Sequence, residues 1–316
     1  MEFFKLKTNI DFLGIRKWSW LLSAILIIAS FSSLAARGIN WGLDFTGGYS
    51  IEVAYPSAPN LDTVHQQLAA AGLSHVDVIT FGSTHDLMLS LAPTQDMQNQ
   101  VVNAQGQSEQ DQLAAKVQTA LGPTATISSV NYTGPEVGAE LAQRGFLAML
   151  VAVLCIMVYI ALRFEMRFAV SAAIALAHDP IIIMGIFSVL QLRFDLTALA
   201  AVLAVIGYSL NDTIVVYDRI RENFRKMRKV SVEEVVNRAI NDTLSRTIMT
   251  SSLTFIVVTV LFFFGGPSIH YFSLALMIGV VVGTYSSIYI AGALAVLFGL
   301  NRQALIPTTK EVDDRP

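Results

Sequence analysis

A few ionisable residues inside apolar stretches could carry chemistry in this chain. Asp179 follows His178 near the middle of one apolar run, Asp212 follows Asn211 in the next, and Arg246 opens a later run. An ionisable side chain inside the hydrocarbon region of a membrane costs about 3 kcal/mol or more, so each needs a partner and a reason. Because a carboxylate can bind and release a proton, these positions are candidates for handling a cation, and Asp212 is the strongest of them.

Each candidate also has a structural interpretation. Asp212 could form a static salt bridge or hydrogen bonds to neighbouring residues of its helix, although intramembrane acids are more often functional. Arg246 lies at a membrane boundary, where its stem can snorkel, so the two interpretations are evenly matched. For His178 and Asp179, packing and proton handling are equally supported. Pro180 should kink their helix and open backbone carbonyls to water or an ion.

Other kinds of chemistry lack a motif. The sequence has no phosphate loop, zinc-ligand spacing or nucleophile elbow, and the Gly47–Gly48 pair has no following lysine. Cys155 is the only cysteine, so it is interpreted as a packing residue. We therefore expect no enzyme activity, catalytic residue, metal site or cofactor, and an ion gradient of protons or sodium rather than ATP as the energy source. Charged residues just past the Asp212 run are expected to form solvated ion pairs: Asp218, Arg219, Arg221 and Glu222.

The elements that position these residues are predicted to be membrane helices. Of the 316 residues, 53% are hydrophobic and 14% charged, and the mean hydropathy is +0.55. The net charge of −3 and the scattered basic residues do not indicate nucleic-acid binding. A helix needs about 20 residues to cross a hydrocarbon core of about 30 Å. Six apolar runs are long enough: 18–36, 145–162, 168–190, 196–217, 247–264 and 272–298.

The first run could instead be a cleaved secretory signal. Lys5, Lys7, Arg16 and Lys17 precede it, and small residues follow near its end. Its apolar core, from 20 to 36, exceeds the usual length of a signal, which favours an uncleaved span.

Orientation follows from the positions of Lys and Arg between the runs. The two short connections on one side carry only Arg193 between them. The positive-inside rule therefore predicts that both termini are cytoplasmic, with tails at 1–17 and 299–316, and that the long connection at 37–144 is exported. The connections assigned to the cytoplasm hold most of the basic residues: Arg163, Arg167, Arg219, Arg221, Arg225, Lys226, Arg228, Lys229 and Arg238.

The long connection is predicted to form a periplasmic α+β domain. Its pattern alternates between strands and helices in the order βαββαβ, which is the ferredoxin-like order. The Gln- and Asn-rich stretch at 93–108 is expected to be a flexible loop. The predicted strands are 50–54, 75–81, 86–91 and 126–132, and the predicted helices are 61–71 and 109–121.

Two features are expected within the membrane part at 145–298. Ser231 and Glu234 form a capping-box pattern, and an amphipathic helix near 231–244 is predicted to lie on the cytoplasmic membrane surface among anionic lipids. Gly279, Gly283 and Ser287 recur at four-residue spacing, which should let the sixth span approach another helix closely.

The sequence resembles the SecF family of protein-export membrane subunits over nearly its whole length. The stretch at 40–48, with Gly42, Asp44, Gly47 and Gly48, is similar to the family's exported-side signature. The run at 207–212, continued through 218–223, is similar to its fourth-span signature. Two shorter matches are 177–179 and 246–247. The resemblance implies six spans with one large exported loop, in the bacterial inner membrane.

The resemblance also implies a mechanism and partners. SecF is similar in architecture to half of a resistance-nodulation-division transporter, and the family uses the proton or sodium motive force to promote preprotein translocation. Asp212 and Arg246 are the positions implied for cation translocation, with Asn211 and Asp179 beside them. The implied partners are a SecD-like subunit, the SecYEG channel, YajC-like and YidC-like proteins, the translocating preprotein and membrane lipids. A small-molecule or lipid transporter of the same superfamily, and a non-transporting scaffold, remain alternatives.

Overall fold

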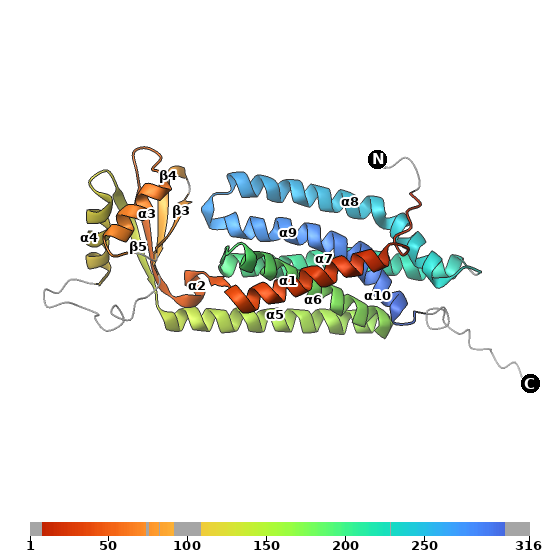
Figure 1. Cartoon of the computed structure of the whole chain (residues 1–316). Coiled ribbons are helices and arrows are strands. Elements are labelled where there is room, and N and C mark those ends of the chain that lie inside the picture. Colours follow the sequence, from red (N-terminus) through yellow and green to blue (C-terminus); the bar gives the residue numbers. More distant parts are fainter. Residues whose placement is uncertain (1–7, 74–75, 82, 92–108, 228, 301–316) are drawn as a thin grey trace, which may run out of the picture.

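The computed structural model describes residues 8–73, 76–81, 83–91, 109–227 and 229–300. Both tails, and the loop predicted at 93–108, lie wholly or partly outside this described part of the chain. The described residues form a long helical bundle with an α+β domain at one end (Figure 1). We call that end the domain end and the opposite end the far end.

Six helical segments in the described part are long and apolar enough to cross a membrane, as predicted. The sixth is continuous through a π-helical segment that interrupts its regular hydrogen bonding. The chain is a multi-pass membrane protein. The segments are α1 (Arg16–Arg37), α5 (Pro135–Arg163), α6 (Met166–Val189), α7 (Leu196–Lys226), α8 (Val232–Phe264), and the sixth span formed by α9 (His270–Ser286), the π segment (Ser287–Ala291) and α10 (Gly292–Leu297).

The centre of the bundle is formed by α6, α7 and the sixth span, in each of which about half of the positions are buried. The other three helices present most of their apolar surface outward, as expected where lipid is the solvent. Small residues allow the closest approach. A Cβ atom on Gly279 would lie 2.0 Å from Val205 Cγ2, and one on Gly283 would lie 3.0 Å from Ser209 Cβ. The predicted small-residue face of the sixth span therefore packs against α7.

The α+β domain follows the predicted order of strands and helices. Its antiparallel sheet has the strand order β3-β4-β2-β5, with α3 and α4 packed on one face. The elements are β2 (Gly48–Ala54), α3 (Leu61–Ala70), β3 (Val76–Phe81), β4 (Ser83–Leu91), α4 (Glu109–Leu121) and β5 (Thr126–Thr133). The core between the helices and the sheet includes Val64 and Leu68 of α3, Val117 of α4, and Ile51 and Leu89 of the sheet.

The predicted surface helix at 231–244 is not a separate element, and that prediction is corrected. These residues form the first turns of the continuous helix α8. The predicted cap is present, since Ser231 Oγ accepts a hydrogen bond of 3.2 Å from Glu234 N. Val235, Val236 and Ile240 are buried in the bundle rather than turned toward a membrane surface. An apolar stripe indicates a buried face but not what covers it.

An N-terminal segment, residues 8–13, helps to cover that face. Ile10 N donates to Asn241 Oδ1 at 2.9 Å, and Phe12 N donates to Asn237 Oδ1 at 2.8 Å. Asn237 Nδ2 and Asn241 Nδ2 in turn donate to Ile10 O. Phe12 and Leu13 at the end of the segment are buried, and two asparagines one turn apart hold the chain before α1 against α8.

Candidate cation-handling site

Asp179 lies at the centre of a buried hydrogen-bond network between membrane helices. Its side chain is fully buried. Asp179 Oδ2 accepts hydrogen bonds from Ser209 Oγ of α7 at 2.6 Å and from Ser286 Oγ of α9 at 2.9 Å. Asp179 Oδ1 lies 2.9 Å from His178 Nδ1. The described ion pairs give it no Lys or Arg partner, so two hydroxyls and an imidazole compensate this carboxylate.

The network continues from His178 to the first span. His178 Nε2 lies 3.2 Å from Ser23 Oγ, and Ser23 Oγ lies 3.0 Å from Tyr285 OH. Tyr285 OH donates to the carbonyl of Ser19 at 2.6 Å. Four spans, α1, α6, α7 and the sixth, are thus joined through Asp179 and His178.

Local sequence makes room for this arrangement. A Cβ atom on Gly283 would lie 3.6 Å from Asp179 Oδ2 and 3.0 Å from Ser209 Cβ, so the glycine lets α9 come close to the carboxylate. Pro180 lies inside α6 and removes the N–H that would bond to the carbonyl of Leu176.

Asp212 lies on α7 one turn after Ser209, in a different environment from Asp179. It is 2% exposed, and its Oδ2 accepts no hydrogen bond within the described residues. Arg246 on α8 is exposed, and its charge acts on Asp212 without forming one of the described ion pairs. Asn211, the preceding residue, is exposed. The structure therefore brings Asp179 into a network but does not join Asp212, Arg246 and Asn211 in direct contact.

A second chain of hydroxyl groups joins α7, α8 and α9. Tyr208 OH donates to Ser251 Oγ at 3.0 Å, and Ser251 Oγ lies 2.7 Å from Thr284 Oγ1. Sequence reasoning named neither this chain nor Ser209, Ser286, Ser23 and Tyr285 as site residues. The available signal was the presence of hydroxyl groups inside apolar spans, where a polar side chain must find a partner.

The signature residues Gly42, Asp44, Gly47 and Gly48 lie at the domain end, apart from Asp179 and Asp212. Asp44 lies in the short helix α2 (Leu43–Thr46). Its Oδ2 accepts a hydrogen bond of 3.0 Å from Leu196 N, the first residue of α7. Asp195 Oδ1 accepts from Ala198 N at 2.7 Å, so two carboxylates cap the start of α7, where acidic groups also oppose the helix dipole.

The glycines of the signature permit close backbone contacts. Strand β1 (Asn40–Trp41) pairs in parallel with β6 (Arg193–Phe194), and Gly42 N donates to Phe194 O at 2.8 Å. Gly47 and Gly48 have φ angles of 73° and 133°, and a Cβ on Gly48 would lie 2.2 Å from Leu91 O. Through these backbone contacts, the signature attaches the end of α1 to the α6–α7 connection and leads directly into the sheet.

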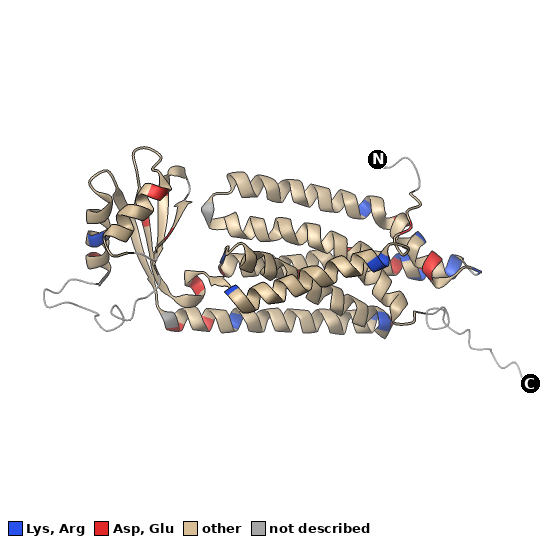
Figure 2. Cartoon of the chain, viewed as in Figure 1, with Lys and Arg blue, Asp and Glu red and all other residues tan. Residues whose placement is uncertain are grey.

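Charged residues gather at the far end of the bundle, around the end of α7 and the start of α8 (Figure 2). Arg219 pairs with Asp242 at 2.9 Å and with Glu222 at 2.6 Å, and Asp218 lies 3.6 Å from Arg163. The predicted ion-pair cluster is present. These pairs are partly exposed, so each contributes little to stability.

Comparison with known proteins assigns the family. The family model described as "Protein export membrane protein SecD/SecF, C-terminal" matches residues 113–301. The model of the SecD/SecF GG motif matches residues 32–55, which contain the signature glycines. A protein translocase subunit SecF of Vibrio alginolyticus is 44% identical over 98% of this chain and 96% of its own length. The chain belongs to the SecF family. The relatives are named as subunits of a translocase, and SecF is not an enzyme family.

Other SecF relatives extend across nearly the whole chain. The SecF subunit of Pseudomonas aeruginosa is 44% identical over 98% of both chains, and that of Escherichia coli O157:H7 is 42% identical over 97% of this chain and 94% of its own. A crystal structure of SecDF, described as a translocon-associated membrane protein from Thermus thermophilus, is 33% identical with a TM-score of 0.80. The match covers 93% of this SecF chain but only 39% of that SecDF chain. A SecDF structure in a "super-membrane-facing form" gives a TM-score of 0.69 over the same shares.

Proposed function

We propose that this chain uses the proton or sodium motive force to promote preprotein translocation across the bacterial cytoplasmic membrane, after or alongside an ATP-driven step. The observation that carries the proposal is the buried Asp179, which contacts His178, Ser209 and Ser286 from three helices. A site whose charge can change at the junction of several helices can bias the packing of those helices when a cation binds or leaves.

Asp212 is proposed as the principal cation-binding residue, with Asp179 as the residue that passes its effect to other helices. Ser209, which bonds to Asp179, and Asp212 are three residues apart and share a face of α7. The unbonded Oδ2 of Asp212 can accept a proton or help to coordinate a sodium ion. Arg246 favours release, because its positive charge opposes a bound cation.

The proposal places the α+β domain on the exported side as a ferredoxin-like domain and both termini in the cytoplasm. The strand order β3-β4-β2-β5, with two helices on one face, supports the ferredoxin-like assignment. The basic residues at the far end support the orientation.

A SecD-like subunit is the proposed partner, because the SecDF chain is about two and a half times as long as the part that this chain matches. Family resemblance further proposes the SecYEG channel, YajC-like and YidC-like proteins as members of the assembly. A change in the packing of α7 would be transmitted to the α+β domain, because Asp44 and the β1–β6 pair attach the start of α7 to that domain.

The test measures export into membrane vesicles with proton and sodium gradients imposed separately. The vesicles carry the native assembly with Asp212→Asn, Asp179→Asn or, as a control, Asp218→Asn. Asparagine keeps the size and a hydrogen-bonding oxygen but cannot change its charge. We expect both intramembrane variants to lose the gradient-dependent increase in export while membrane level and assembly stay near normal. The control, at a half-exposed ion pair, should keep most of the increase.

Two outcomes would contradict the proposal. Equal loss in all three variants would mean that charge in general, rather than a cation path, had been disturbed. Full export by Asp212→Asn and Asp179→Asn together would assign both residues a structural role. A response to only one imposed gradient identifies the coupling ion.

A further inference from the structure

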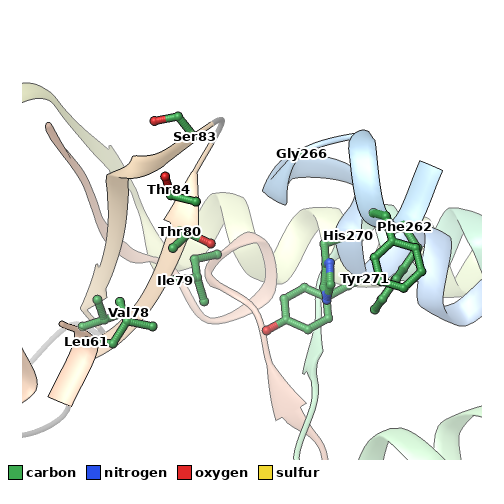
Figure 3. A pocket seen from close by; sticks show the side chains of 11 residues that line it. Leu61, Val78, Ile79, Thr80, Ser83, Thr84, Phe262, Gly266, His270 and Tyr271 are labelled. Carbon is green, nitrogen blue, oxygen red and sulfur yellow. The ribbon is translucent and has the colours of Figure 1, made fainter. Parts of the chain in front are cut away.

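A cleft of about 650 Å³ separates the α+β domain from the turn between α8 and α9 (Figure 3). Its volume lies within the range of about 300–1,000 Å³ that is typical of ligand pockets. One wall comes mainly from β3 and the start of β4, and the other from the end of α8 and the start of α9. The cleft is distant from the buried carboxylates. It belongs neither to the hydrogen-bond network of Asp179 nor to the series of hydroxyl groups that joins α7, α8 and α9.

The edge of strand β3 faces this cleft. In the order β3-β4-β2-β5, β3 pairs with β4 and has no strand on its other side among the described residues. Three consecutive residues, Val78, Ile79 and Thr80, line the cleft. Successive side chains of a strand point to opposite faces, so consecutive residues can line one cavity only where the strand edge faces it. Such an edge presents backbone N–H and C=O groups to an incoming strand.

The opposite wall is largely aromatic. The Phe262 and His270 rings lie with their centroids 4.3 Å apart, and the Tyr271 ring points from α9 toward the strands (Figure 3). No Asp, Glu, Lys or Arg is among the residues that line the cleft. A ligand would therefore be held by main-chain hydrogen bonds and by apolar contacts, neither of which demands a particular sequence.

We propose that this cleft binds an extended segment of unfolded polypeptide, which adds to the β3 edge as a further strand and packs apolar side chains against the aromatic wall. This inference rests on the proposed function, which supplies such a chain on this side of the membrane.

Other occupants fit the cleft less well. A lipid acyl chain would leave the β3 edge groups without partners, and an anionic headgroup would meet no Lys or Arg. A second copy of this chain would have to bring a whole folded domain, rather than one extended strand, into the space between β3 and the α8–α9 turn.

The first test measures peptide binding to the full chain with its partner in lipid nanodiscs. The probe is a fluorescein-labelled ten-residue peptide of alternating valine and threonine, compared with the same peptide N-methylated at every second residue. N-methylation removes the N–H donors of one edge, and we expect it to weaken binding about tenfold. Phe263→Ala, which truncates a lining residue, should weaken binding severalfold, whereas the adjacent Phe264→Ala should not.

Phe263 and Phe264 are 71% and 84% exposed, so neither truncation removes a core residue. Equal affinity for the two peptides, absence of binding, or equal effects of the two truncations would overturn the inference. Binding requires no ion gradient, so this result is independent of the test of the proposed function.

The second test identifies the natural occupant with a photoreactive residue in place of Thr80, which is exposed at the cleft. A defined export substrate is stalled during translocation, and the same photoreactive residue at Thr119, exposed on α4, is the control. We expect an adduct with the stalled substrate from Thr80 and none from Thr119. Adducts only with lipid, with a second copy or with the partner subunit would overturn the inference, even where gradient-driven export is intact.

Discussion

At Asp179, a fully buried carboxylate has no Lys or Arg partner among the described ion pairs. Two serine hydroxyls and one imidazole contact it, and all three belong to elements that must stay together for the contacts to persist. Removing one partner of a buried charge costs more than removing a hydrogen bond at the surface. Ser209 and Ser286 should therefore be needed for gradient-driven export, although neither side chain can change its charge.

Ser286 provides a test with a neighbouring control. Ser286→Ala removes the 2.9 Å hydrogen bond to Asp179, and we expect it to destabilise the bundle by about 1–3 kcal/mol and to reduce gradient-dependent export. Ser287→Ala removes only a bond within its own helix, to the carbonyl of Thr284, and should have a small effect. Thermal unfolding and vesicle export are measured for both, and equal effects would contradict the central role of Asp179.

Charge inside apolar runs was enough to find Asp179 and Asp212 in the sequence, because few residues are charged there. Their surroundings could not be predicted in the same way. Ser209 and Ser286 contact Asp179 across sequence separations of 30 and 107 residues, which periodicity does not encode. For the same reason, the sequence placed Arg246 at the start of an apolar run but could not show that its side chain is exposed on α8.

Helices were easier to predict than the contacts between them. The six spans follow from hydropathy, since a helix is one of the few structures that satisfies its backbone in lipid. Hydropathy does not show where a helix continues past the membrane, and so α8 begins at Val232, well before its apolar run. Small-residue spacing did predict the tight face of the sixth span, because only glycine allows backbones to come this close.

Packing between α7 and α9 can be tested with two glycines. Gly279→Ala places a Cβ atom 2.0 Å from Val205 Cγ2 and should destabilise the protein by about 1–3 kcal/mol through overpacking. Gly207→Ala, in the middle of α7, meets no atom within 4 Å and should be neutral or slightly stabilising. Thermal unfolding in detergent compares the two, and similar losses would show that the helices do not approach as described.

The cap on α7 gives a prediction about a contact that sequence reasoning missed. Asp44→Ala removes the hydrogen bond to Leu196 N across 152 residues, which should cost about 1 kcal/mol. We expect faster amide exchange at the first turn of α7, whereas Asp195→Ala should affect chiefly Ala198, its own partner. Unchanged exchange at Leu196 in Asp44→Ala would contradict a direct attachment of α7 to the signature.

At the scale of the whole molecule, the two ends differ in charge and in architecture. The α+β domain lies at one end, while the far end carries the ion-pair cluster of α7 and α8 (Figure 2). The sequence predicted this polarity from basic residues in short connections, and it predicted the order of strands and helices in the domain. It did not predict the contacts that attach the domain, among them the two-residue β1–β6 pairing, the Asp44 carboxylate and the contact of Arg193 with Ser90.

Membrane orientation is tested with reporters fused after Gln105 and after Arg228. We expect the first to report the exported side and the second the cytoplasm, because basic residues are retained inside. Fusions after Leu121 and Lys226, at the ends of α4 and α7, serve as independent checks. Reporters that give the same side would exclude the proposed topology.

The asparagine contacts of the N-terminal segment set an order of events during synthesis. Ile10 bonds to Asn241, 231 residues later in the chain. A ribosome adding about 5–20 residues per second needs roughly 10 to 50 seconds to make that length. Throughout this interval the backbone groups of residues 10–13 have no α8 to bind, so the beginning of the protein is among the last parts to dock. Insertion factors thus have a period in which the first span is in the membrane while the segment before it is still accessible.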